Sequence, residues 1–194
     1  MNLLFPIETA YPPGFSYKED FLSADEEELL LRSVLQTELH PMVFQGYEAK
    51  RKVASYGYDW SFEKRALTKG KLIPQQFSFL VEKLTEHLQL SKDAIAELLV
   101  TEYPVGSVIN WHRDAPPFDL IAGISLLSDC TFKLRPYDTD KRNRKSVVSL
   151  TVKRRSLYIM QGAARSEWEH SISPVKQVRY SVTLRTLKQS NQAK

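Results

Sequence analysis

The chain has 194 residues and a mass of 22.4 kDa, which suits one domain and leaves little room for a second. Its hydrophobic content of 42% and charged content of 26% are ordinary for a globular protein, and no apolar run reaches the roughly 18 residues of a membrane span. The start lacks the pattern of a secretory signal, and the single cysteine, Cys130, excludes an internal disulfide. We therefore expect one cytoplasmic domain over residues 1–194, monomeric and not bound to a membrane.

The charge is distributed unevenly along the chain. Residues 1–100 carry 11 Lys and Arg against 15 Asp and Glu, a net charge of −4, whereas residues 101–194 carry 16 against 8, a net charge of +8. A basic half of this kind suggests an anionic partner such as nucleic acid, although a solvated basic surface explains it equally well.

The N-terminal part predicts two helices. Residues 1–20 contain three prolines and are expected to form an extended arm packed on the domain. Ser23 and Glu26 have the spacing of a capping box, and apolar residues follow at helical spacing, which predicts a helix over about 24–37. Residues 41–60 mix β-forming residues with glycines and predict short strands or a hairpin. Pro74 can start a second helix that runs to about residue 90.

From residue 97 onward the pattern is that of strands separated by turn residues. The predicted strands are 97–103, 107–112, 121–127, 130–136, 146–151, 156–160 and 179–187. Strands at this spacing after two helices predict an α+β fold in which the helices cover one face of a β-sandwich. Residues 188–194 are polar and are expected to fray.

His112 and Asp114 form an H-x-D pair within a predicted strand, where residues two apart point to the same face. A metal bound there needs a third ligand, and His170 is the other histidine of the C-terminal half. Two imidazoles and one carboxylate make the facial triad of non-haem Fe(II) oxygenases, which leaves coordination positions open for a co-substrate and O₂. A surface His–Asp hydrogen bond is the simpler explanation of H-x-D alone.

The last predicted strand strengthens the metal hypothesis. Its alternation places Arg179, Ser181, Thr183 and Arg185 on one face. Two arginines that face a core are costly unless they meet anions, and a dicarboxylate beside a metal is such an anion. The alternative is an exposed edge strand with both arginines in water.

Taken together, H-x-D, a distant histidine and R-x-S-x-T-x-R resemble the AlkB family of Fe(II)/2-oxoglutarate dioxygenases. The family usually has Asn where this chain has Ser181. Thr101 to His112 resembles the family segment that leads into the metal histidine, with Thr101 in place of the usual Asn, and Val43 to Gly57 is similar to its nucleotide-recognition lid. The resemblance covers about residues 15–187 and implies a double-stranded β-helix, that is, a jelly-roll core.

The resemblance implies that Fe(II), 2-oxoglutarate and O₂ are the cofactors. It assigns Fe(II) to His112, Asp114 and His170. It places 2-oxoglutarate against Arg179 and Tyr103, with Ser181 and Thr101 beside them, and puts Arg185 near the metal end, close to the other carboxylate or to Asp114.

The resemblance also implies oxidative demethylation of N-alkylated bases in DNA or RNA, releasing formaldehyde, succinate and CO₂. Residues 41–60 would form the substrate-recognition lid. The candidate substrate contacts are Phe44 as a wedge, Tyr56, Tyr58 and Trp111 as stacking partners, and Arg51 and Arg113 near phosphate or the lid. For the aromatic residues the alternative is ordinary core packing, which is the more favoured explanation of Trp111 and Phe44. For Arg51 and Arg113 the alternative is a solvated surface position. Ala115 follows Asp114 where many base-repairing members have acidic residues, so the resemblance does not extend to the identity of the base.

Three further hypotheses remain open from the sequence. The segment from Lys133 to Arg155 contains two basic turns, 141–145 and 153–155, that could contact phosphates or simply protect a strand edge. The same oxygenase chemistry could serve a protein or small-molecule substrate, and the basic turns alone could make a non-catalytic nucleic-acid-binding module.

Overall fold

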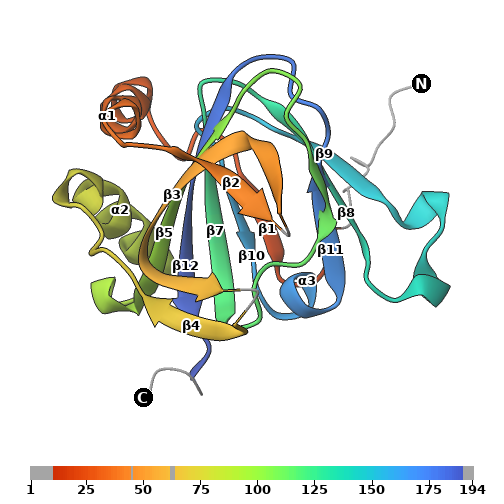
Figure 1. Ribbon diagram of the computed structural model, residues 1–194. Coiled ribbons are helices and arrows are strands. Elements are labelled where there is room, and N and C mark those ends of the chain that lie inside the picture. Colours follow the sequence, from red (N-terminus) through yellow and green to blue (C-terminus); the bar gives the residue numbers. More distant parts are fainter. Residues whose placement is uncertain (1–10, 45, 62–63, 190–194) are drawn as a thin grey trace.

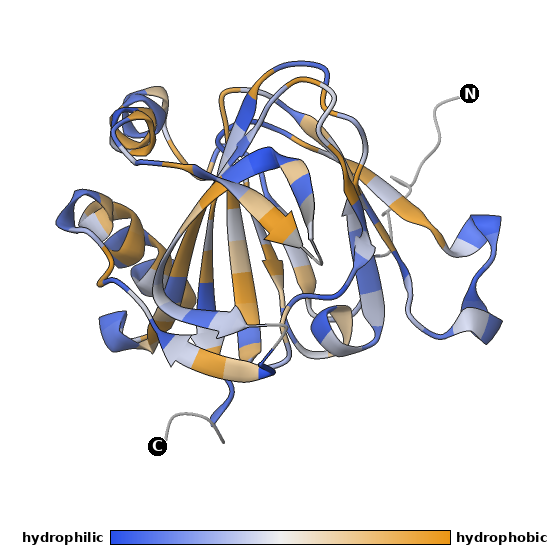
Figure 2. Ribbon diagram, viewed as in Figure 1, coloured by the Kyte–Doolittle hydropathy of each residue, from blue (hydrophilic) through white to orange (hydrophobic). Residues whose placement is uncertain are grey.

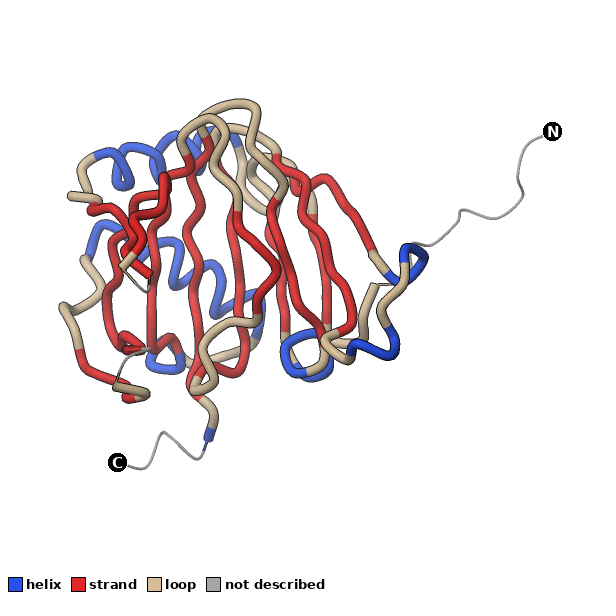
Figure 3. Tube along the Cα trace, turned by 45° about the vertical axis from the view of Figure 1, so that its right-hand side comes forward, coloured by secondary structure: helices blue, strands red, loops and turns tan. Residues whose placement is uncertain are grey.

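The computed structural model describes residues 11–44, 46–61 and 64–189 and contains two antiparallel sheets (Figures 1 and 3). The larger sheet has the order β1-β10-β7-β12-β5-β3-β2, with β4 paired to β3, and the smaller sheet has the order β6-β11-β8-β9. In the larger sheet the strands are β1 (Phe15–Lys18), β2 (His40–Phe44), β3 (Tyr47–Ser61), β4 (Ala66–Lys69), β5 (Ile95–Tyr103), β7 (Phe118–Leu126), β10 (Leu157–Met160) and β12 (Arg179–Leu187). Those of the smaller sheet are β6 (Ile109–His112), β8 (Cys130–Pro136), β9 (Val148–Val152) and β11 (Trp168–Ile172).

Helices α1 (Ala24–Leu35) and α2 (Ser78–Leu88) lie together on one face of the larger sheet (Figure 1). The capping box at Ser23 and Glu26 is present, which confirms the predicted start of α1. A 3₁₀ turn, Gln75–Phe77, separates Pro74 from α2, so the second helix starts later than the proline indicated. Leu30 of α1 and Leu84 of α2 are buried against Val182 of β12, which confirms helices packed over a β-sandwich. A short third helix, α3 (Gly162–Ser166), was not predicted.

The space between the two sheets holds a second apolar core. Tyr103 and Tyr158 of the larger sheet pack there with Phe132 and Leu134 of the smaller sheet. Hydropathy varies along the strands (Figure 2). Strands β7, β10 and β12 are buried on both faces because they lie between the two cores. Polar side chains of β3, β5, β6, β11 and β12 also project into the space between the sheets.

The predicted strands are all present within a few residues of their expected limits, and the limits of β8 and β12 agree fully. Strand β11 was missed because Glu169, His170 and Ser171 break the apolar alternation that marks a strand. Pairing with β6 on one side and β8 on the other forms it instead. The predicted arm includes β1, which pairs with β10, and residues 190–194 of the predicted frayed tail lie outside the described residues.

The predicted hairpin of residues 41–60 corresponds to β2 and the longer β3, which also pairs with β5. The hairpin thereby becomes the edge of the larger sheet. Within the described residues, we find no helix long and apolar enough to span a membrane.

Gly57 of β3 lies opposite Glu97 of β5, with a φ of +88° and an ideal Cβ only 2.1 Å from the Ala96 carbonyl oxygen. We expect Gly57→Ala to lower the free energy of unfolding by more than about 2 kcal/mol, because the positive φ alone costs an L-residue roughly 1–2 kcal/mol and the backbone must also move. Gly46→Ala is the matched control, since Gly46 has a φ of +80° and nothing within 4 Å of its ideal Cβ. Urea unfolding measures the free energy of unfolding of both variants. Equal decreases in the two would contradict the role of the close contact between Gly57 and the Ala96 carbonyl.

Candidate metal and co-substrate site

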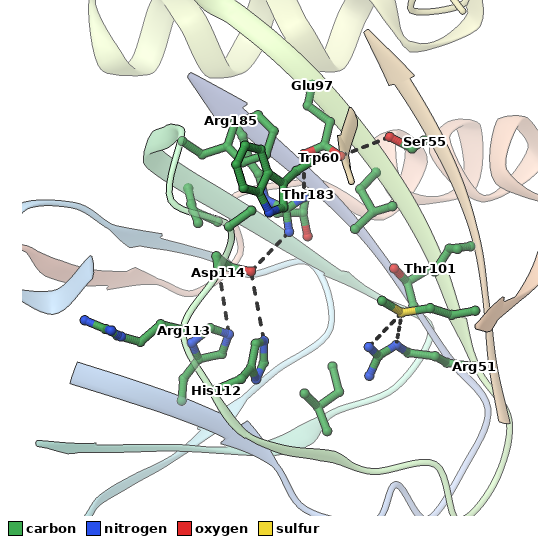
Figure 4. A pocket seen from close by; sticks show the side chains of 18 of the residues that line it. Arg51, Ser55, Trp60, Glu97, Thr101, His112, Arg113, Asp114, Thr183 and Arg185 are labelled. Carbon is green, nitrogen blue, oxygen red and sulfur yellow. Dashed lines mark hydrogen bonds and ion pairs between the residues drawn. The ribbon is translucent and has the colours of Figure 1, made fainter. Parts of the chain in front are cut away.

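A cavity of about 720 Å³ lies between the two sheets and is lined by residues of both. Its walls include β3, β5 and β12 of the larger sheet and β6, β8 and β11 of the smaller sheet. This volume is in the range of small-molecule sites. Figure 4 shows the polar side chains that converge in it, with Asp114 at their centre.

His112, Asp114 and His170 offer ligand atoms that all lie within 4.8 Å of one another. His112 ends β6 and pairs directly with His170 of β11, so the sheet register brings the two imidazoles together, with ring centroids 4.2 Å apart. The Nε2 atoms of His112 and His170 lie 4.0 Å and 3.9 Å from the two carboxylate oxygens of Asp114. The structure thus assembles the predicted triad.

The protonation states suit a metal. Burial, together with the neighbouring His112, lowers the pKa of His170 to about 3, so its imidazole is neutral at pH 7. Burial opposes ionisation of Asp114, but Arg185 and the two histidines outweigh it and hold the pKa of its carboxyl well below the usual range. His112 Nδ1 lies 2.9 Å from the Asn110 carbonyl oxygen, which can only accept, so the proton sits on Nδ1 and Nε2 is free to bind a metal. Neutral imidazoles and an ionised carboxylate are the forms that bind metal.

Arg185 connects the triad to the larger sheet. Its Nη2 lies 3.3 Å from Asp114 Oδ1, while its Nη1 pairs with Glu97, which also accepts a hydrogen bond of 2.9 Å from Ser55 Oγ. A chain of contacts thus runs from β3 through β5 and β12 to the carboxylate (Figure 4). Of the two positions that the resemblance allowed for Arg185, the structure shows the one beside Asp114.

Arg179 is a buried cation with spare hydrogen-bonding capacity. It is 1% exposed, its Nε donates to Ser125 Oγ at 2.9 Å, and its Cζ lies 4.8 Å from the Tyr103 ring centroid. Its Nη1 has no hydrogen-bond partner, and no carboxylate of the described residues lies within ion-pair distance. An unsatisfied buried guanidinium is costly, so the position suits an incoming carboxylate.

The strand register arranges the other predicted co-substrate residues around Arg179. Across the β12–β5 pair, Arg179 lies opposite Tyr103 and Ser181 opposite Thr101. All four side chains are buried, and Ser181 Oγ donates to the Tyr103 hydroxyl at 3.5 Å. Tyr103 and Thr101 line the cavity. The strand register therefore brings the four predicted residues together, and two of them line the cavity.

The predicted substrate contacts are only partly brought together. Arg51 and Arg113 line the cavity, and two nitrogens of Arg51 contact Met42 Sδ at 3.0 and 2.8 Å. None of the three predicted stacking residues, Tyr56, Tyr58 and Trp111, lines the cavity. Tyr56 packs against Phe77 in the core under the helices, Tyr58 packs in a cluster near Phe118, and Trp111 faces out of the smaller sheet beneath Arg135. The Phe44 side chain lies outside the described residues.

Three features in and around the site were not predicted from the sequence. Trp60 lines the cavity together with its neighbours Asp59 and Ser61, whereas the sequence favoured Tyr56 and Tyr58. Glu97 is a buried counter-ion for Arg185, which the pattern of β5 did not mark. Arg165 of α3 is buried, and its Nη2 donates to the carbonyl oxygens of Asp114 (3.0 Å) and Ala115. It therefore holds the backbone that carries the metal ligand.

This arrangement fits Fe(II) and 2-oxoglutarate. The triad has the ligand types of a facial triad, and the unpaired Nη1 of Arg179 suits the distal carboxylate of a five-carbon dicarboxylate. The jelly-roll core and this donor set define a metal-dependent oxygenase.

Comparison with known proteins also indicates a metal-dependent oxygenase. The family model described as the 2OG-Fe(II) oxygenase superfamily matches residues 14–186, so the chain belongs to this superfamily. The protein is an Fe(II)/2-oxoglutarate-dependent dioxygenase, and the resemblance to the AlkB family is confirmed by its relatives.

A mouse protein named tRNA (carboxymethyluridine(34)-5-O)-methyltransferase ALKBH8 is 31% identical over 174 residues, which are 86% of this chain and 25% of the relative. An Arabidopsis thaliana protein named alkylated DNA repair protein ALKBH8 homolog is 28% identical over 182 residues, 82% of this chain and 51% of the relative. The chain thus spans about a quarter to a half of the length of these relatives.

Solved structures show the same fold. The structure of OsALKBH1 superposes with a TM-score of 0.70 at 16% identity, covering 91% of this chain and 98% of the other. A prolyl hydroxylase from Trichoplax adhaerens, solved with a peptide fragment, has a TM-score of 0.67 at 16% identity, covering 93% and 86%. These likenesses confirm the predicted double-stranded β-helix.

Asp114→Ala should weaken Fe(II) binding by more than about a hundredfold, because even an outer partner of a metal ligand contributes ten- to hundredfold. The fold should persist, since Arg185 keeps Glu97 as its partner. Anaerobic Fe(II) titration and thermal unfolding measure the two effects. Asp59→Ala, at an exposed carboxylate of the same cavity, is the control and should bind metal normally. Equal affinity in both variants would exclude Asp114 as a ligand.

Arg179→Ala should raise the KM for 2-oxoglutarate by about ten- to hundredfold with a smaller change in kcat, because a charged hydrogen bond contributes about 1.5–3 kcal/mol. Arg179→Lys should have a KM for 2-oxoglutarate between those of the wild type and Arg179→Ala, since lysine keeps the positive charge but lacks the planar guanidinium. A direct 2-oxoglutarate titration supports the kinetics independently. An unchanged co-substrate affinity in Arg179→Ala would show that the carboxylate binds elsewhere.

Proposed function

We propose that the protein oxidatively demethylates N-alkylated bases in DNA or RNA. The observation that carries the proposal is one cavity that is lined by both the metal triad and the β2–β3 hairpin. The buried Arg179 contacts the ring of Tyr103, which also lines this cavity. The names of the mouse and Arabidopsis relatives refer to tRNA and to alkylated DNA, which supports a nucleic-acid substrate.

Bound Fe(II) with 2-oxoglutarate and O₂ supplies an oxidant that hydroxylates a C–H bond. One oxygen atom enters an N-methyl group and the other enters succinate, with loss of CO₂. The N-hydroxymethyl group then breaks its N–C bond, leaving formaldehyde and an N–H. The protein supplies binding and orientation for this chemistry.

Each group of residues has a role in the proposal. His112, Asp114 and His170 hold the metal, while Arg185 and Arg165 fix the carboxylate and the backbone of Asp114. Arg179 and Tyr103 hold the distal carboxylate of 2-oxoglutarate, with Ser181 and Thr101 beside them.

The hairpin serves as the substrate-recognition lid of this proposal. Met42, Arg51 and Ser55 of the hairpin line the cavity, so a base that enters passes along it. Trp60, on the same strand, replaces Tyr56 and Tyr58 as the aromatic partner of the base. A base inside a duplex cannot reach the cavity and must be flipped or already unpaired.

The test is formaldehyde release from oligonucleotides that carry 1-methyladenine or 3-methylcytosine, as single- and double-stranded DNA and RNA. We expect formaldehyde and succinate in equal amounts from at least one substrate and none from Asp114→Ala. If no substrate gives formaldehyde while the enzyme still converts 2-oxoglutarate, the demethylase proposal fails. Hydroxylated product without formaldehyde would indicate an oxygenase of another substrate.

A further inference from the structure

The outer face of the smaller sheet carries a cluster of cations that the metal site does not use. Phe132 and Leu134 of β8 point into the core, so Lys133 and Arg135 point outward. Arg113 follows β6, and Lys141, Arg142, Arg144 and Lys145 lie in the β8–β9 connection, which projects from the body opposite the helices (Figures 1 and 2). We call these seven residues the basic face; they outnumber the four nearby carboxylates Asp138, Asp140, Glu167 and Glu169.

One carboxylate organises part of the basic face. Arg135 Nε donates to Glu169 Oε2 at 2.7 Å, and Arg142 Nη2 lies 3.3 Å from the same oxygen. Arg135 also lies over the Trp111 ring, with its Cζ 4.4 Å from the centroid. Two guanidinium groups share a single negative charge, so one positive charge is left over at a partly exposed, ordered position.

Arg113 joins the basic face to the cavity. It lines the cavity beside His112 and Asp114 and donates from Nη1 to the Ser166 carbonyl at 2.9 Å. Its Cζ lies 3.5 Å from the centroid of the Tyr137 ring, which is 47% exposed at the end of β8. A stacked guanidinium keeps its remaining N–H groups in a fixed plane, which suits a phosphate.

The predicted basic segment contains one group of cations that are ion-paired and another group that are not. Lys153, Arg154 and Arg155 form ion pairs with Glu19, Glu27 and Asp20 near α1, so this turn fastens the N-terminal region. By contrast, no carboxylate among the residues that the structure describes lies within ion-pair distance of Lys133, Arg144 or Lys145. Within the segment from Lys133 to Arg155, the cations without an ion pair therefore lie on the basic face.

We propose that the basic face binds the phosphate backbone of the nucleic-acid strand whose target base enters the cavity. This proposal rests on the proposed function. If the target base enters the cavity, Arg113 lies between that nucleotide and the neighbouring nucleotides on the basic face. The spread of cations from the cavity to the tip of the β8–β9 connection suits a polyanion better than a single phosphate. The substrate is thus a strand rather than a free nucleoside.

The experiment measures binding of unmodified single-stranded RNA and DNA of about 15 nucleotides by fluorescence anisotropy at several salt concentrations. The full chain is used without Fe(II) or 2-oxoglutarate. Lys133→Gln/Lys145→Gln should raise Kd about five- to tenfold and reduce the slope of log Kd against log salt by about 1.4, since each single-strand phosphate contributes about 0.7. Both side chains reach solvent, so the melting temperature should not change.

Lys18→Gln/Lys92→Gln is the matched control, because it removes the same charge from exposed positions away from the smaller sheet. It should keep nearly the wild-type Kd and slope. Equal losses in the two double variants, unchanged binding in both, or tighter binding of a polyglutamate peptide than of either strand would overturn the proposal.

The two proposals fail separately. Strand binding that depends on Lys133 and Lys145 without formaldehyde release from methylated strands would refute only the demethylase function. Formaldehyde release from wild type, together with unchanged strand binding in the Lys133 and Lys145 variant, would refute only the basic face.

Discussion

The contact on which the site depends is the ion pair between Arg185 and Asp114. It joins the end of the last strand to the metal ligand, and Glu97 balances its charge. Buried charges are tolerated only when they are paired, and Arg185 has two carboxylate partners, Asp114 and Glu97. Because Glu97 also accepts a hydrogen bond from Ser55 of β3, the position of the carboxylate is linked to the hairpin that lines the cavity.

The register of two strand pairs builds the rest of the site. Pairing of β11 with β6 sets His170 opposite His112, and pairing of β12 with β5 sets Arg179 opposite Tyr103 and Arg185 opposite Glu97. A shift of one residue in either pair would turn these side chains to the other face. The apolar residues that alternate with them on β12, such as Val182, are buried under the helices, which stabilises this register.

The division of charge has a similar origin. The acidic N-terminal half supplies Glu19, Asp20 and Glu27, which form ion pairs with the three cations of the turn at 153–155. Part of the positive charge of the C-terminal half is therefore neutralised by α1 and the residues before it. Part of the remaining excess lies on and beside the smaller sheet, where Arg113 also lines the cavity. Net charge alone does not distinguish the ion-paired turn at 153–155 from the turn at 141–145, which is only partly ion-paired, because both are runs of Lys and Arg.

Much of the fold and site could be predicted from the sequence by itself. The capping box at Ser23, the alternation of Arg179 to Arg185 and the H-x-D pair at His112 depend on neighbouring residues, which local spacing reveals. The tertiary structure decided what depends on distant partners: that polar β11 is a strand, that Tyr56 faces the helices while Trp60 lines the cavity, and that Arg165 holds the backbone of Asp114. Sequence periodicity tells which residues share a face, but only packing between remote segments determines what that face meets.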